Sequence, residues 1–442
     1  MAAASVLTSL TAREEPARAS AAPARGRPRA GRRGRFEAWV QRWSEPLFAL
    51  VVLTWLWTLT VQARVPMSTA MITMASLTLV RGLGTPAGRA EVDQLPRHPL
   101  HYWPAALLVA YLLVFAWTST YRYAWERVEF ASQLLLVPVA FFVWRAHLTR
   151  WRDAYVVALC GFAAAAAGAV AAYALANYDA LVVALGQGRA VPVPRGQHVP
   201  FAVALAFAVL LGVDLLARRR GALRWWGGAC AAVCALALHL VAVRTGLVLL
   251  YLGFAGYGMR WAWRRWGGLL AVGAAAGGLA VLALAALQIP SVERRVAYAR
   301  YDLERATSER AGAYSDGGRV LSFRAALAVI ADDPLLGAGP RGMGAAMAGE
   351  YDRLGLAGQR HAPTNQWLFS WTYAGLAGFV GVWCVLLTPL WARGWWRRPL
   401  VAEWMVLTGA WWMVESPLET AVGPALALAV LYLILADRSV AE

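Results

Sequence analysis

The sequence predicts an all-α, polytopic transmembrane protein with about twelve membrane-spanning helices and a large non-cytoplasmic loop that contains further helices. Three observations carry this prediction. Hydrophobic residues make up 60% of the 442-residue chain, and its mean hydropathy is +0.49. Apolar runs of membrane-spanning length recur along it, and arginines gather in alternate loops. Together these observations exclude a soluble globular domain.

The apolar runs define the expected spans. A bilayer core about 30 Å thick is crossed by a helix of roughly 20 apolar residues. Runs of about this length occur at residues 45–63, 66–80, 102–119, 128–144, 154–176, 199–217, 223–241, 245–259, 267–289, 366–390, 400–414 and 419–436.

The arginines orient these spans. All 42 basic residues are arginine, and the net charge is +17. The loops on the side of the Arg-rich N-terminus hold 16 arginines, and the short loops on the other side hold 6. Short cytoplasmic loops are enriched in basic residues, so both termini are expected in the cytoplasm. The positive charge is interpreted as loop anchoring and attraction to anionic lipid. No nucleic-acid partner is expected, because the arginines lie on both sides of the bilayer rather than in one stripe.

This topology divides the chain into five parts. Residues 1–43 are predicted to be a disordered, Arg-rich cytoplasmic tail without the apolar core of a signal peptide. Residues 44–289 contain spans one to nine, and residues 364–437 contain spans ten to twelve. Residues 290–363 form the large loop, and residues 438–442 are the cytoplasmic C-terminus.

The large loop is far longer than a connection requires, and such loops usually carry function. Its first part, from Ser291 to about Arg310, mixes arginines with acidic and apolar residues, as in a helix at the headgroup surface. Its second part is predicted to be a helix over residues 319–332, ended by Pro334 and the glycines that follow. The apolar residues of this helix stand at helical spacing, at Val320, Phe323, Leu327 and Ile330.

Arginines on the outer side are unexpected, because membrane topology places most arginines in the cytoplasmic loops. Each of these outer arginines therefore needs an anionic partner. Arg122 and Arg127 are either interfacial anchors or partners of Glu126, or they bind a ligand. Arg195 either solvates a turn or binds a ligand. Arg244 has almost no loop around it. Several guanidinium groups on one side of a membrane suit a phosphate or a lipid pyrophosphate, because guanidinium offers paired donors and stays charged.

His361 stands where the large loop re-enters the membrane. Its imidazole is a candidate general base for a sugar hydroxyl, and the alternative is a histidine that caps the next helix or bonds a carbonyl group. Asp-x-Asp, His-Glu-x-x-His and Cys/His patterns are missing from the outer segments, so no metal or other cofactor is expected.

Three segments resemble the bacterial O-antigen ligase and polymerase superfamily. They are Arg319 leading a helix into Asp333-Pro-Leu-Leu-Gly-Ala-Gly-Pro340, the element Arg244-Thr-Gly246, and His361 with Asn365 opening a helix. The specific part of the resemblance covers residues 319–378 and the Arg244 element. The sequence departs from the family at Thr364, where many members have histidine.

The resemblance implies a metal-independent, inverting GT-C type glycosyltransferase of the bacterial inner membrane whose site faces the periplasm. Its donor would be a glycan on undecaprenyl pyrophosphate, and its acceptor would be lipid A core. Membrane lipid would surround the enzyme. The resemblance further implies catalytic roles for His361 and Arg319. The arginines expected to bind the donor pyrophosphate are Arg122, Arg127, Arg195 and Arg244, and those expected to bind the phosphorylated acceptor are Arg294, Arg295 and Arg300.

Three other functions remain open. An O-antigen polymerase and a protein O-oligosaccharyltransferase use the same donor chemistry. A transporter or flippase for an anionic lipid-linked substrate is a different class, and it would carry interrupted spans and ionisable residues at mid-membrane depth. Asp214 and Glu403 instead fall near the inner ends of their spans.

Overall fold

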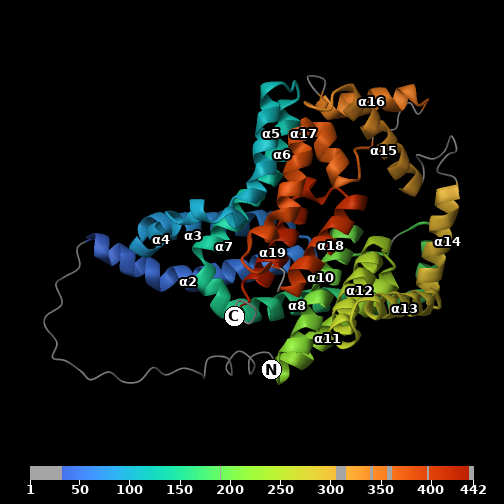
Figure 1. Ribbon diagram of the computed structural model, residues 1–442, viewed down its shortest axis with the longest axis horizontal. Coiled ribbons are helices and arrows are strands. Elements are labelled where there is room, and N and C mark those ends of the chain that lie inside the picture. The colour runs from blue at the N-terminus through green and yellow to red at the C-terminus, as the bar shows by residue number, and fades with distance from the viewer. Residues whose placement is uncertain are drawn as a thin grey trace.

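The computed structural model describes residues 32–189, 191–304, 315–338, 342–355, 361–395 and 398–437. Helices are its regular elements, and this part of the chain contains no strand. The predicted all-α class is therefore confirmed for the described residues. Figure 1 shows the helices crossing one another around a common centre.

Six helices of the described chain are long and apolar enough to cross a membrane. They are α2 (Arg32–Val61), α8 (Arg145–Ala176), α10 (His198–Arg218), α11 (Ala222–Val241), α13 (Gly268–Leu287) and α17 (Gln366–Leu387). The chain is thus a multi-pass membrane protein. The count of about twelve spans stays a prediction for the other six apolar runs.

Those six runs also form helices, but shorter, interrupted or more polar ones. The third run is divided into η3 (Trp103–Ala105), α5 (Ala106–Leu113) and η4 (Val114–Ala116). The fourth is divided at Ser132 between α6 (Tyr121–Ala131) and α7 (Gln133–Val143). The remaining four runs form α3 (Arg64–Gly84), α12 (Arg244–Trp266), α18 (Pro399–Val414) and α19 (Val422–Leu435).

Short helical elements connect the apolar helices. They are α4 (Pro86–Val92), η1 (Leu95–Arg97), η2 (Pro99–His101), α9 (Tyr178–Gly186), η5 (Pro194–Gly196), η8 (Thr388–Trp391) and η10 (Pro417–Glu419).

The core lies around α10 and α19. Every residue of α19 from Val422 to Ile434 is buried, and α10 is the most buried of the six long apolar helices. A helix that is apolar on all sides either packs among other helices or faces lipid, and the burial of α19 shows that other helices surround it. Helix α19 packs against α7, α18, α8 and α2, and Figure 1 shows it in the middle of the molecule.

The chain ends depart from the predicted division. Helix α2 begins at Arg32, inside the segment predicted to be a disordered tail, and residues 1–31 and 438–442 lie outside the described chain. Arg152, Arg218 and Arg219 of the predicted inner loops form a partly buried ion cluster with Asp153, Asp214 and Asp437. Arg152 lies 3.5 Å from Asp214 and 3.7 Å from Asp437, and Arg219 lies 2.9 Å from Asp153.

The described residues of the large loop between α13 and α17 form three helices, α14 (Pro290–Glu304), α15 (Ser315–Asp332) and α16 (Gly342–Arg353). Helix α15 ends at the predicted residue and begins earlier, at Ser315. The first predicted helix is described as far as Glu304, and residues 305–314 lie outside the described chain. Helix α16 was not predicted, and its apolar residues are mostly alanine and methionine.

Two glycines hold the end of α15 against α17. Gly375 has φ +60°, and a Cβ atom there would lie 2.0 Å from the carbonyl oxygen of Leu335. Gly337 has φ +78°, and a Cβ there would lie 2.7 Å from the Thr372 carbonyl oxygen. Only glycine permits both the left-handed backbone and this close approach. The Ala338 amide then donates to the Thr372 carbonyl at 2.7 Å, which places α15 beside the start of α17.

Candidate functional site

Arg319 lies on α15 and forms an ion pair with Glu415, the residue that ends α18. Its Nη2 atom is 2.7 Å from Oε1 of Glu415, and the two side chains are 25% and 26% exposed. Burial raises the pKa of the Glu415 carboxyl, and the Arg319 charge opposes that change. The pair is therefore half-buried.

Asn365 connects this pair to the start of α17. Its Oδ1 accepts from the Leu368 amide at 3.0 Å and caps the helix. Its Nδ2 donates to the carbonyl of Met413 at 3.0 Å, two residues before Glu415. The first turn of α17 and the end of α18 are thus joined next to Arg319.

His361 stands four residues before this cap and is exposed. Its backbone carbonyl accepts from the Tyr351 hydroxyl at 3.0 Å, and the two rings meet edge to face. Because Asn365 is the helix cap, the alternative in which His361 caps α17 is excluded. His361 thus precedes the first turn of α17, which Asn365 joins to the end of α18, and Arg319 of α15 meets that end of α18 at Glu415.

Arg127 takes part in a second, deeper polar network. It contacts Glu419 of η10 through the backbone carbonyl at 3.1 Å and through Oε2 at 3.4 Å. The other carboxylate oxygen, Oε1, accepts from Tyr111 and from Nε2 of Gln366, the latter at 2.9 Å. Oε1 of Gln366 accepts from the amide of Leu418 at 2.9 Å. This network fastens α5, α6 and α17 to the turn that carries Glu415.

Replacement of Glu419 by alanine is expected to destabilise the protein by about 3–5 kcal/mol, because Arg127 would lose the acid that compensates its buried charge. Glu419→Gln keeps the side-chain volume and is expected to destabilise the protein by a smaller amount. Thermal unfolding of the purified protein in detergent measures both. The exposed Glu304→Ala is the control, since its pair with Arg300 lies at the surface. An equal melting temperature for Glu419→Ala and wild type would contradict a structural role.

Arg122 has a different environment from Arg127. Its side chain is 96% exposed and lies 3.8 Å from Glu126, an arrangement that contributes little to stability. Arg127 is 12% exposed, and its guanidinium lies over the ring of Tyr123 at 4.8 Å. Both predicted partnerships with Glu126 are present, and Arg122 remains accessible to a ligand.

The other predicted arginines belong to the region of α9, α10, α12 and α14. Arg195 is exposed in η5 with φ +57°, and Arg244 opens α12, which packs on α10 at Gly246. On α14, Arg294 is exposed, Nη1 of Arg295 donates to the Arg189 carbonyl at 3.4 Å, and Arg300 pairs with Glu304 at 3.1 Å. Figure 1 shows α14 at the edge of the molecule, meeting the end of α13.

Sequence reasoning missed Glu415, Glu419 and Gln366. The need of each outer arginine for an anion was recognised, but the partners considered were Glu126 and a ligand, not these two acids. The two acids, four residues apart in the short outer turn between the last two spans, were the available signal. Within the described chain, no group of three His, Cys, Asp or Glu side chains could hold a metal ion.

Residues 230–383 match a family described as O-antigen ligase. The matched segment includes Arg244, Arg319 and His361, whereas Arg127, Arg195, Glu415 and Glu419 lie outside it. No curated protein matches the chain. This match supports an O-antigen ligase or polymerase family assignment for the segment from residue 230 to residue 383.

Proposed function

We propose that the protein is an O-antigen ligase. It transfers a glycan from undecaprenyl pyrophosphate to lipid A core at the periplasmic face of the inner membrane, without a metal ion. The observation that carries this proposal is the half-buried Arg319–Glu415 pair at the end of α18, which Asn365 joins to the start of α17 just after His361, in a chain whose residues 230–383 match an O-antigen ligase family.

In this mechanism Arg319 exchanges its carboxylate partner for the donor pyrophosphate. The guanidinium then stabilises the negative charge that grows on the leaving pyrophosphate as the glycosidic bond breaks. His361 accepts the proton of the acceptor hydroxyl while that oxygen forms the new bond to the anomeric carbon. One displacement of this kind inverts the anomeric configuration, and undecaprenyl pyrophosphate leaves.

The remaining arginines have supporting roles in the proposal. Arg195, Arg244 and Arg122 extend the positive field toward the donor, and Arg127 acts through Glu419 by holding the turn that carries Glu415. The arginines of α14, Arg294 among them, attract the phosphates of lipid A core. This charge favours a ligase over a polymerase, whose acceptor is a second lipid-linked glycan.

The test is reconstitution of the purified chain with undecaprenyl-pyrophosphate-linked O-antigen and lipid A core, with EDTA present and ATP absent. A ladder of glycan on lipid A core with inverted linkages is expected. Lengthening of the donor glycan alone would identify a polymerase, and transfer to added protein would identify an oligosaccharyltransferase. Inactivity toward every acceptor, with uptake of the donor into vesicles, would identify a transporter.

A further inference from the structure

A cavity of about 320 Å³ lies between α12 and α18, at the end of the molecule that the arginine distribution predicts to be cytoplasmic. Its mouth includes Ala402 and Val406, both exposed, the latter by 56%. On a membrane helix, exposed apolar residues face lipid, so the cavity opens sideways into the bilayer. Its volume is at the lower end of the range for small-molecule sites.

An ion pair stands in this apolar cavity. Nη1 of Arg260 lies 2.6 Å from Oε1 of Glu403, and the side chains are 22% and 7% exposed. A Cβ on Gly256 would lie 3.3 Å from Cγ of Glu403, so glycine permits the close approach of the carboxylate to α12. Ionisable residues at such positions are costly, and they mark binding sites and pathways.

Both partners have unused hydrogen-bonding capacity. Oε2 of Glu403 is buried and has no hydrogen-bond partner among the described residues. A buried carboxylate oxygen without a donor is destabilising. Arg260 lies over the ring of Tyr257 at 4.4 Å and donates to Glu403 through Nη1, which leaves further N–H groups on the partly exposed guanidinium. The pair can thus receive a donor at Glu403 and an anion at Arg260.

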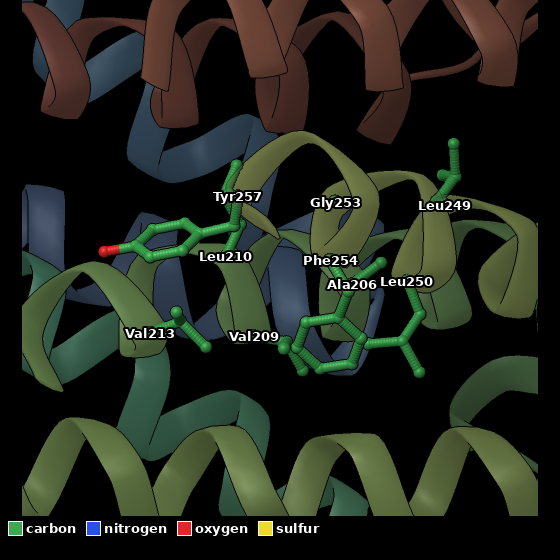
Figure 2. A pocket seen from close by; sticks show the side chains of 9 residues that line it. All are labelled: Ala206, Val209, Leu210, Val213, Leu249, Leu250, Gly253, Phe254 and Tyr257. Atoms are coloured by element: carbon green, nitrogen blue, oxygen red, sulfur yellow. The ribbon is translucent and has the colours of Figure 1, made fainter. Parts of the chain in front are cut away.

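Two other cavities lack this feature. Figure 2 shows the apolar contact of α10 with α12, where Tyr257 lies at one end of a cavity of only about 10 Å³. A cavity of about 300 Å³ between α3, α4 and α7 is similar in size to the one at α18, but no ionisable residue lines it. The charge pair therefore distinguishes the α12–α18 cavity from a packing defect of the same volume.

We propose that the α12–α18 cavity binds a phospholipid with a zwitterionic amine headgroup from the cytoplasmic leaflet. The ammonium group donates to Oε2 of Glu403, the phosphate accepts from Arg260, and an acyl chain lies along Leu252, Val406 and Leu407. An anionic headgroup without an amine would leave the Glu403 oxygen without a charged donor. This inference is independent of the proposed glycan transfer.

The experiment is native mass spectrometry of the full chain, released from nanodiscs that hold phosphatidylethanolamine and phosphatidylglycerol in equal amounts. Wild type is expected to retain phosphatidylethanolamine over phosphatidylglycerol by about tenfold, the effect of one charge-assisted hydrogen bond. Glu403→Gln is expected to lose this preference. Ala402→Phe, which fills the cavity but keeps the ion pair, is expected to lose the bound lipid.

The matched control is Ala75→Phe, which fills the similar cavity at α3 and is expected to leave the preference unchanged. The proposal is overturned if wild type and Glu403→Gln retain the two lipids in the same ratio. It is also overturned if wild type prefers phosphatidylglycerol, since Arg260 alone would then explain the binding. If Glu403→Gln does not fold, the Ala402→Phe variant tests the proposal. Unchanged lipid retention in Ala402→Phe would exclude this cavity as the lipid-binding site.

Discussion

Arg319→Ala is expected to lower the rate of glycan transfer by about 100- to 1000-fold, the usual effect of removing one group that stabilises transition-state charge. The physical reason is the placement of the guanidinium, which is accessible yet partly shielded from water at the corner where α15, α17 and α18 meet. The measurement is the initial rate of lipid A core glycosylation at saturating donor. Arg324→Ala, an exposed arginine on the same helix, is the control and should retain activity.

A purely structural loss can be separated from a chemical one. Arg319→Ala leaves Glu415 partly buried without this partner, and that alone could destabilise the corner. The double variant Arg319→Ala/Glu415→Gln removes the uncompensated charge. If the double variant regains both stability and transfer, Arg319 serves the fold and not the reaction. If it regains stability and stays inactive, the assignment of Arg319 to the leaving pyrophosphate is supported.

His361→Ala is expected to lower the transfer rate by about 100- to 10 000-fold, the range for loss of a general base. The side chain is exposed, and the backbone around it is held by Tyr351 through the carbonyl oxygen. Its truncation should therefore leave the fold intact. The rate is measured with and without added imidazole, which should restore part of the activity if the missing group accepts a proton.

His98→Ala is the matched control, an exposed histidine on the predicted cytoplasmic side, and it should behave as wild type. Full activity in His361→Ala would remove the histidine from the mechanism. Glu415 would then be the nearest remaining proton acceptor beside Arg319. A product with retained anomeric configuration would contradict the single displacement that both residues are proposed to serve.

Local properties of the sequence predicted much of the fold. Apolar runs specified where helices form, because burial of a helix in lipid depends on about 20 consecutive residues and not on distant partners. The end of α15 at Asp332 followed from apolar spacing and the proline after it. The breaks in the third and fourth runs were not predicted, although Pro104 in the third run was a local signal for an interruption.

The roles of the candidate site residues stay predictions. The sequence pointed to Arg319 and His361 as candidates, but it did not indicate the acids that face the arginines. Arg319 meets Glu415 across 96 positions of the chain, and Arg127 meets Glu419 across 292. Such pairs arise from the packing of distant helices, and no pattern within one helix encodes them.

The sequence by itself therefore determined that this is a helical membrane protein, where its apolar helices form and which residue types could bind a pyrophosphate. Tertiary structure alone decided which of those residues meet. Gly375 illustrates the reason, because its left-handed backbone is needed only once Leu335 lies against it. Hydropathy and helix propensity are properties of neighbouring residues, whereas the geometry of a site is set by contacts between helices that the chain order separates.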